Sequence, residues 1–242
     1  MLTTGKEAIP LYVQITDLLV SRISRGVWQP GDLIPSEVKL AEELNVSQGT
    51  IRKAITELAE NNVLVRKQGR GTFVSNHDSR RALFHFFHIA DHNGKKVMPD
   101  SEVLDCRQKK ATRREADRLR LDADEPVIKI KRIRKLGSRP TIVETIALPH
   151  SRFSKLDNQK ERHLPNMLYE LYEKRFGITI HRAEEQLRAA VAGRQEAKLL
   201  ELEEGAPLLV IERIAFTLDG IPVELRISRC NTKHHHYQTT LM

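Results

Sequence analysis

The sequence predicts an α+β protein that folds as two domains. The first third contains three segments with the helical spacing of apolar residues, followed by a Gly-containing hairpin pattern. A polar segment without periodicity, residues 76–81, follows and is typical of an interdomain linker. The rest, residues 82–240, contains a helix-then-hairpin pattern twice, which favours helices packed on one antiparallel sheet. We therefore expect a domain at residues 9–75, a linker, and a larger second domain.

The composition narrows the classes of function. The 242 residues carry 40 Lys and Arg against 32 Asp and Glu, and this net charge of +8 favours an anionic partner, nucleic acid first among them. The chain has only two cysteines, Cys106 and Cys230, so neither a disulfide framework nor a CxxC motif can form. No signal-peptide pattern opens the sequence and no apolar run approaches the ~18 residues of a membrane span. We expect a cytoplasmic protein without a membrane partner.

Three helices are predicted in the first domain, at residues 11–25, 36–44 and 47–62. Ser36 and Ser47 are favourable N-caps for the second and third helices, and Asn45 is a favourable left-handed C-cap between them. Because the link between these two helices is only a few residues long, the pattern indicates a helix-turn-helix.

One face of the third helix carries polar and cationic side chains and no acidic residue. At about 100° per residue, Gln48, Gly49, Arg52 and Lys53 lie roughly opposite the apolar side of the helix. The hairpin at residues 64–74 adds further cations beside it, as phosphate contact requires, although an ordinary solvated helix face has similar residues. The candidate DNA-binding residues are Ser36, Ser47, Gln48, Gly49, Thr50, Arg52, Lys53, Arg66, Lys67, Gly69 and Arg70.

Several motifs occur in a fixed order within residues 9–75. They are Ile9–Tyr12, Gly26–Asp32, Leu33–Glu37, Leu40-Ala41, Val46-Ser47 and Gly69–Val74. This set resembles the winged helix-turn-helix of GntR-family transcriptional regulators, which implies a DNA-binding domain. That family usually has arginine where this chain has Val38 and Gln48, and it has arginine, as here, at Arg52. The resemblance therefore implies an operator that differs from the family's usual one.

The second domain contains a faint internal repeat. Residues 114–119 resemble residues 195–200 at an offset of 81, and each segment precedes a strand, a turn and a second strand. Between the two copies, a helix is predicted at about residues 165–176 and a strand at about residues 179–192. Two such units predict an antiparallel sheet covered by helices.

The strand predicted at residues 127–135 places charge on an apolar face. Because strand side chains alternate, Arg132 and Arg134 share a face with two isoleucines. Charge on such a face is costly unless it is paired, and Glu144 on the next strand is the candidate partner. Two interpretations stay open. The arginines belong either to a buried Arg–Glu network that only fixes the fold or to an anion-binding site.

Further motifs follow in the second domain. They are Glu125-Pro126-Val127, Arg132-Ile133-Arg134, Val143-Glu144, Leu168-Tyr169-Glu170, Gly205-Ala206-Pro207 and Glu224–Ser228. These residues look like the UTRA domain of the HutC branch of the GntR family, which implies a chorismate-lyase-like fold with a pocket for a small effector. The effector-binding residues implied by this resemblance are Arg132, Arg134, Glu144, Tyr169, Arg182 and His235.

Other pocket positions depart from the members of this branch that bind sugar phosphates. Phe87 and Met167 stand where those members have small hydroxyl residues, and Lys233–His235 stands where they have Asp-Arg-Tyr. We therefore expect a carboxylate or an imidazole-like compound as readily as a phosphate-bearing metabolite.

Neither catalytic residues nor a metal or cofactor site is expected. The segment Ser36–Lys39 fits an S-x-x-K pattern, but Ser36 is explained as a helix cap and the partner motifs are missing. The run His234–His236 has no cysteine or carboxylate cluster nearby in sequence, which argues against a metal site.

The sequence therefore predicts a homodimeric, ligand-responsive transcriptional regulator, and a repressor in particular. Its expected partners are a double-stranded DNA operator with inverted repeats, a small anionic effector and a second copy of the chain. Two alternatives stay open. One is an enzyme that acts on a small aromatic acid through the chorismate-lyase-like domain, and the other is a DNA-binding protein that needs no ligand.

Overall fold

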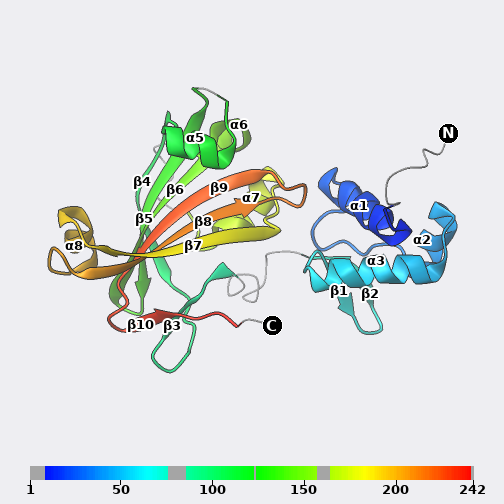
Figure 1. Cartoon of the computed structure of the whole chain (residues 1–242), viewed down its shortest axis with the longest axis horizontal. Coiled ribbons are helices and arrows are strands. Elements are labelled where there is room, and N and C mark those ends of the chain that lie inside the picture. Colours follow the sequence, from blue (N-terminus) through cyan, green and yellow to red (C-terminus); the bar gives the residue numbers. More distant parts are fainter. Residues whose placement is uncertain (1–8, 76–85, 123, 157–163, 241–242) are drawn as a thin grey trace. The chain divides into compact units, whose positions relative to one another are not determined.

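The computed structural model describes residues 9–75, 86–122, 124–156 and 164–240. The chain forms two compact units, residues 1–76 and 77–242 (Figure 1). The predicted linker, residues 76–81, lies outside the described residues. Among the described residues, no helix is both long and apolar enough to cross a bilayer.

The first unit is a three-helix domain with a two-stranded hairpin. Its elements are α1 (Leu11–Ser24), α2 (Glu37–Leu44), α3 (Gln48–Glu60), β1 (Leu64–Lys67) and β2 (Gly71–Val74). The predicted caps are confirmed, since the side chains of Ser36 and Ser47 accept hydrogen bonds from the backbone N–H groups of Lys39 and Thr50. Asn45 ends α2 with a left-handed φ of 52°. The core of the unit includes Leu19, Leu40, Ile51, Ala54, Ile55 and Leu58.

The second unit is built on a six-stranded antiparallel sheet of order β4-β5-β6-β9-β8-β7 (Figure 1). The first half comprises β4 (Asp100–Lys110), α5 (Arg113–Leu119), β5 (Pro126–Leu136) and β6 (Arg139–Pro149). The second half comprises β7 (Arg182–Val191), α8 (Arg194–Leu200), β8 (Pro207–Phe216) and β9 (Pro222–Cys230). The strand order is symmetric about the β6–β9 pair, so the internal repeat extends to a strand before each helix.

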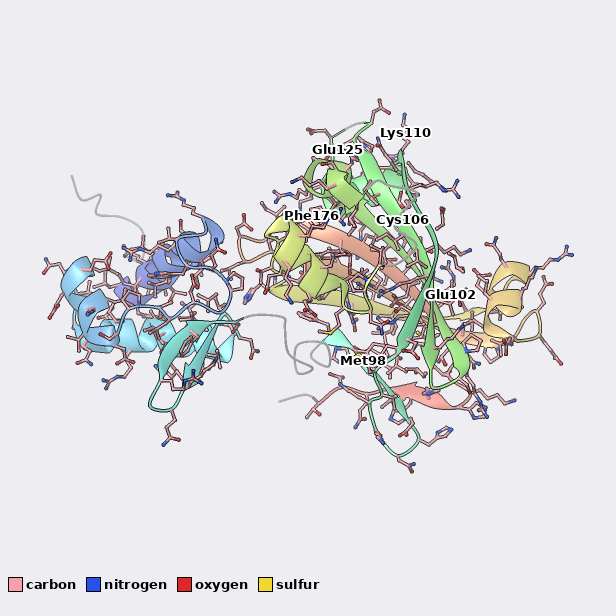
Figure 2. The ribbon with its side chains drawn as sticks, turned by 180° about the vertical axis from the view of Figure 1, so that it is seen from behind. Met98, Glu102, Cys106, Lys110, Glu125 and Phe176 are labelled. Carbon is pink, nitrogen blue, oxygen red and sulfur yellow. The ribbon has the colours of Figure 1, made fainter. Side chains whose placement is uncertain are left out.

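The remaining elements cover one face and one end of the sheet. They are β3 (Ile89–Asp91), α6 (His150–Phe153), a 3₁₀ turn (Ser154–Leu156), α7 (Leu168–Phe176) and β10 (His235–Tyr237). Helix α7 lies over the strands in Figure 2, and the labelled Phe176 and Cys106 pack in the same apolar cluster. Strand β10 pairs with β3 in a separate two-stranded sheet. The helix predicted at about residues 165–176 begins at Leu168, and the strand predicted at about residues 179–192 begins at Arg182, so both begin later than expected.

Candidate functional site

The exposed face of α3 carries the side chains that the sequence predicts for DNA contact. Gln48, Gly49, Arg52 and Lys53 are all exposed, whereas the opposite side of the helix is buried, with Ile51, Ala54, Ile55 and Leu58. Gly49 carries no side chain on this face, and a Cβ atom there would meet only the Ser47 Oγ atom, at 3.8 Å. The face therefore combines one position without a side chain with the polar and cationic side chains of its neighbours.

A carboxylate connects this face to the hairpin. The Glu37 Oε2 atom accepts a hydrogen bond from Arg52 Nε at 2.9 Å, and its Oε1 atom lies 3.3 Å from Arg66 Nη2. Arg66 Nη2 also donates to Thr56 Oγ1 at 3.1 Å. By contrast, the Lys53 ammonium lies over the ring of Tyr12 on α1, 3.7 Å from its centroid. Arg52 is thus held by Glu37 of α2, and Lys53 is held by the Tyr12 ring of α1.

The hairpin forms a cationic wing beside α3. Lys67 Nζ lies 4.4 Å from the centroid of the Phe73 ring, and Arg70 is exposed in the turn. Gly69 and Gly71 adopt left-handed φ values of 68° and 108°, which favour glycine. At Gly71 a Cβ atom would also lie 2.7 Å from Leu33 Cδ1, so only glycine fits there without a shift. The candidate residues of α2, α3 and the hairpin all lie in this first unit.

A cavity lies in the second unit, against the face of the sheet that α7 covers. Its empty volume, with the open mouth included, is about 700 Å³. It is lined from β5, β6, β8, β9 and β10, from the start of α7 with the two residues before it, and from residues 86–89. Its charged and hydroxyl lining residues include Arg132, Arg134, Glu144, Arg213, Arg226 and Ser228.

One buried carboxylate, Glu144, organises this cavity. Its Oε2 atom accepts a hydrogen bond from Arg132 Nε at 2.6 Å. Its Oε1 atom lies 3.6 Å from Arg226 Nη1, 4.0 Å from Arg134 Nη1 and 3.3 Å from Ser228 Oγ. Burial raises the pKa of Glu144, but the arginines outweigh it and hold this pKa well below its usual range. Glu144 is therefore ionised, and the predicted pairing of the strand arginines with it is confirmed.

The arginines outnumber the carboxylates that balance them. Arg213 pairs with Glu185 through its Nε atom at 2.7 Å, and Arg226 pairs with Glu224 through its Nη2 atom at 2.8 Å. With Arg132 and Arg134 sharing Glu144, the four guanidinium groups meet three carboxylates. The cavity thus holds one positive charge in excess among these residues.

Arg134 carries most of this excess. Its side chain is 2% exposed, and burial together with the nearby Arg132 lowers the pKa of Arg134 to about 9, which leaves it protonated at neutral pH. Its Nε and Nη2 atoms, and the Nη2 atom of Arg132, have no hydrogen-bond partner among the described residues. Buried donors of this kind are costly when they are unsatisfied.

Aromatic and aliphatic side chains form much of the rest of the wall, which also contains His88, Asn166 and Glu170. The Arg134 guanidinium lies 5.3 Å from the centroid of the Phe87 ring, and Phe86 packs edge-on against Tyr169. Ile142 and Ile211 line the same cavity. The arrangement offers cationic donors at one part of the cavity and an apolar surface at another.

Four of the six predicted effector-binding residues line this cavity, namely Arg132, Arg134, Glu144 and Tyr169. The structure places the other two outside the lining. Arg182 begins the edge strand β7, is paired with Glu184 and lies 4.0 Å from the centroid of the Phe216 ring. His235 lies on β10, opposite Asp91 of β3. In these places neither side chain joins the Glu144 cluster.

Arg213, Arg226 and Ser228 also line the cavity, although the sequence patterns did not mark them as effector-binding residues. A signal existed for Arg213, because it stands 81 positions after Arg132, at the offset of the repeat. Among the described residues, no cluster of three or more His, Cys, Asp or Glu side chains could hold a metal ion.

Comparison with known proteins places both units in one family. The sequence model of the bacterial regulatory proteins of the gntR family matches residues 11–74, and that of the UTRA domain matches residues 94–236. The chain belongs to the GntR family. GntR regulators bind DNA and sense small molecules, and a winged helix followed by a UTRA domain fits the HutC branch.

Three relatives illustrate the membership of this chain in the GntR family. The HTH-type transcriptional repressor NagR of Bacillus subtilis is 31% identical over 217 residues, which cover 89% of this chain and 88% of the relative. The histidine utilization repressor of Pseudomonas aeruginosa is 41% identical over 87 residues, which cover 36% of this chain and 35% of the relative. A solved ligand-binding domain of a GntR-family regulator from Bordetella bronchiseptica matches with a TM-score of 0.61 and 34% identity, covering 65% of this chain and 98% of that domain.

The family membership decides between the broad classes of function. The relatives are transcriptional repressors and not enzymes, so the chain is a DNA-binding transcriptional regulator and the enzymatic alternative is wrong. The fold agrees with the α+β expectation of a winged helix followed by a UTRA domain.

Proposed function

We propose that this GntR-family regulator is a repressor that binds an inverted-repeat operator as a homodimer. When a small anion enters the cavity of the second unit, the repressor dissociates from the operator or changes its arrangement on it. The observation that carries the ligand part is the set of buried guanidinium donors without partners on Arg132 and Arg134. An anionic group would satisfy these donors and balance the excess positive charge. A purely structural Arg–Glu network would gain nothing from leaving such donors unpaired.

The anion is proposed to be a carboxylate with a compact unsaturated or imidazole-like body. The aromatic and aliphatic part of the wall, with Phe87, Ile142 and Ile211, offers such a body apolar contact. A phosphate-bearing metabolite is the competing class, because guanidinium groups bind phosphate as well as carboxylate.

The response to the ligand is proposed to start at residues 86–89 of the cavity wall, which follow the linker in the sequence. Arg213 Nη2 donates to the Phe86 carbonyl oxygen, and the backbone N–H of Gln238 donates to the His88 carbonyl oxygen at 2.8 Å. Phe86 and His88 follow closely, in the sequence, after the predicted linker. A ligand that draws Arg213 toward itself would release the Phe86 carbonyl. The placement of the two units would change with the occupancy of the cavity.

The homodimer is proposed to form through the second unit. Both edge strands of the six-stranded sheet expose apolar side chains, with Leu104 on β4 and with Leu187 and Val191 on β7. Unpaired edges with exposed apolar residues are suited to pairing with another strand. A second copy of the chain is the occupant that a two-fold operator would require.

The ligand site is tested with Arg134→Ala. Benzoate, imidazole-4-acetate and glucose 6-phosphate serve as probes in thermal unfolding and operator-release assays. We expect a carboxylate probe to stabilise the wild type increasingly with concentration, by about 2.7 kcal/mol at one hundred times its Kd. Arg134→Ala should lose this stabilisation while it keeps operator binding, because Arg134 lies in the other unit.

The control for this experiment is Lys135→Ala. Lys135 is the next residue of the same strand, but its side chain is paired with Glu102 on the outer side at 2.9 Å, so its loss should leave the ligand response unchanged. The ligand-independent alternative wins if no probe stabilises the wild type and Arg134→Ala only lowers the stability of the second unit. A response to glucose 6-phosphate alone would select the phosphate class.

A further inference from the structure

One carboxylate joins three elements of the DNA-binding unit. Glu37 is the first residue of α2, and its side chain is 23% exposed. Its two oxygen atoms take different partners, since Oε2 accepts from Arg52 Nε on α3 at 2.9 Å and Oε1 lies 3.3 Å from Arg66 Nη2 on β1. Glu37 therefore holds Arg52 of α3 and Arg66 of the wing at the same time.

A hydroxyl group closes this network on the other side. Arg66 Nη2 donates to Thr56 Oγ1 at 3.1 Å, and Thr56 Oγ1 donates to the Arg52 carbonyl oxygen at 2.8 Å, one helical turn earlier. A hydroxyl has one proton to donate and can accept as well, so both bonds can exist together. Exposed ion pairs are individually weak, and what this network supplies is a fixed geometry for two cations.

The hydrogen bond between Glu37 and Arg52 determines which edge of the Arg52 guanidinium group stays available to a ligand. A guanidinium group has five N–H donors in a rigid fork and can bind a carboxylate, phosphate or guanine along more than one edge. Glu37 accepts a hydrogen bond from the Nε atom of Arg52. Among the described residues, none accepts a hydrogen bond from the two terminal nitrogen atoms of Arg52. The terminal Nη1–Nη2 edge is thus left for a ligand.

We propose that Glu37 is a positioning residue for operator recognition, which presents the terminal edge of Arg52 to a guanine and fixes Arg66 of the wing beside it. This proposal rests on the proposed contact of α3 with operator bases. The terminal edge of arginine matches the O6 and N7 acceptors of guanine in the major groove. A carboxylate beside DNA also repels phosphates, so Glu37 weakens binding to every sequence while it sharpens the contact with one base pair.

The test compares Glu37→Gln with Glu43→Gln. Each variant removes one negative charge from α2, but Glu43 is paired with Arg22 of α1 at 2.7 Å and contacts neither Arg52 nor Arg66. Binding is measured to an operator selected from a randomised pool and to random duplex, over a range of salt concentrations. For Glu37→Gln we expect tighter binding to random duplex and about a tenfold loss of the operator-to-random ratio, a size within the range of one base contact. Glu43→Gln should keep the wild-type ratio.

Two further variants separate positioning from charge and from folding. Glu37→Asp keeps the charge but is one methylene shorter, so it should lower the operator-to-random ratio without tightening binding to random duplex. Arg52→Ala should lose base preference at one position of the operator, and Glu37→Gln should lose it at that same position. A thermal unfolding curve of each variant is measured to check that the DNA-binding unit is folded.

Three results would overturn the proposal. A folded Glu37→Gln variant with the wild-type ratio would show that the network does not position Arg52. Loss of preference at a position that Arg52→Ala leaves unchanged would show that Glu37 contacts a base itself. If Arg52→Ala and Arg70→Ala both leave operator binding unchanged, the proposed contact of this face with DNA fails as well, and the two failures are thereby distinguished.

Discussion

Gln48 is the first residue of α3, and its exposed side chain stands where GntR winged helices often have arginine. Glutamine pairs best with the N6 and N7 atoms of adenine, whereas arginine pairs with the O6 and N7 atoms of guanine. Gln48→Arg should therefore shift the preference at one operator position from A·T toward G·C, by about 1–3 kcal/mol. Selection of operators from a randomised pool with both proteins measures this shift.

Val38→Ala is the comparison for this substitution. Val38 is the other position of the first unit where the family usually has arginine, and its side chain is exposed but can read no base by hydrogen bonds. Its truncation should leave base preferences as they are. Identical preferences for the wild type and Gln48→Arg at every position would refute base readout by Gln48 and would favour a phosphate contact at the helix start.

Single residues of the cavity could be predicted only where a local pattern marks them. The alternation of β5 marks Arg132 and Arg134, because two charges interrupt an apolar face. Arg226 and Ser228 lie on β9, where a mixture of polar and apolar residues resembles any half-exposed strand. The pairing of β6 with β9 sets Ser228 opposite Glu144, and this register depends on contacts between distant segments.

At the scale of an element, the wing is expected to contribute affinity and not base preference. Arg70 is exposed in the turn between β1 and β2, next to the left-handed Gly69 and Gly71. Arg70→Ala should weaken binding to operator and to random duplex by the same factor, and should make the salt dependence shallower by about one unit, because one phosphate contact is lost. Titrations of both duplexes at several salt concentrations measure the two slopes.

The neutral neighbour Gln68 supplies the control for the wing. Gln68→Ala changes an exposed residue of the same turn without a change of charge, so the salt dependence should stay at the wild-type value. If Arg70→Ala instead alters the preference at one base pair and leaves random duplex unaffected, the wing reads sequence and its assignment to phosphates is incorrect.

Helices with polar caps could be predicted closely, whereas the edge strand β4 could not. Ser36, Ser47 and Asn45 mark the ends of α2 and α3 in the sequence, and the structure uses all three. Helix α7 has Met167 at its N-cap without a side-chain hydrogen bond, so its start carries no signal. Strand β4 was not predicted, because an edge strand with several exposed charged residues lacks the apolar alternation of a half-buried one.

At the scale of the whole molecule, the repeat explains why the cavity is cationic on both sides of the sheet centre. The two halves meet at the β6–β9 pair, and Arg132 in one half corresponds to Arg213 in the other. The strand partner of Arg132 is Glu144, whereas the strand partner of Arg213 is Arg226. Glu185 and Glu224 balance Arg213 and Arg226 in the second half, whereas Arg132 and Arg134 share the single carboxylate of Glu144, so the excess positive charge lies in the first half.

The proposed homodimer requires an operator with two symmetry-related half-sites, and this requirement can be tested by changing the DNA sequence and leaving the protein unchanged. A winged helix of this size reads few base pairs, so two copies must act together to select one site. Scrambling one half of the inverted repeat removes the base contacts of one protomer, at about 1–3 kcal/mol for each mismatched base pair, and should lower the affinity at least tenfold. Light scattering of the wild-type complex should show two chains per duplex. Unchanged affinity for the half-scrambled duplex, with one chain bound, would show that a single protomer suffices and that the dimer plays no part in recognition.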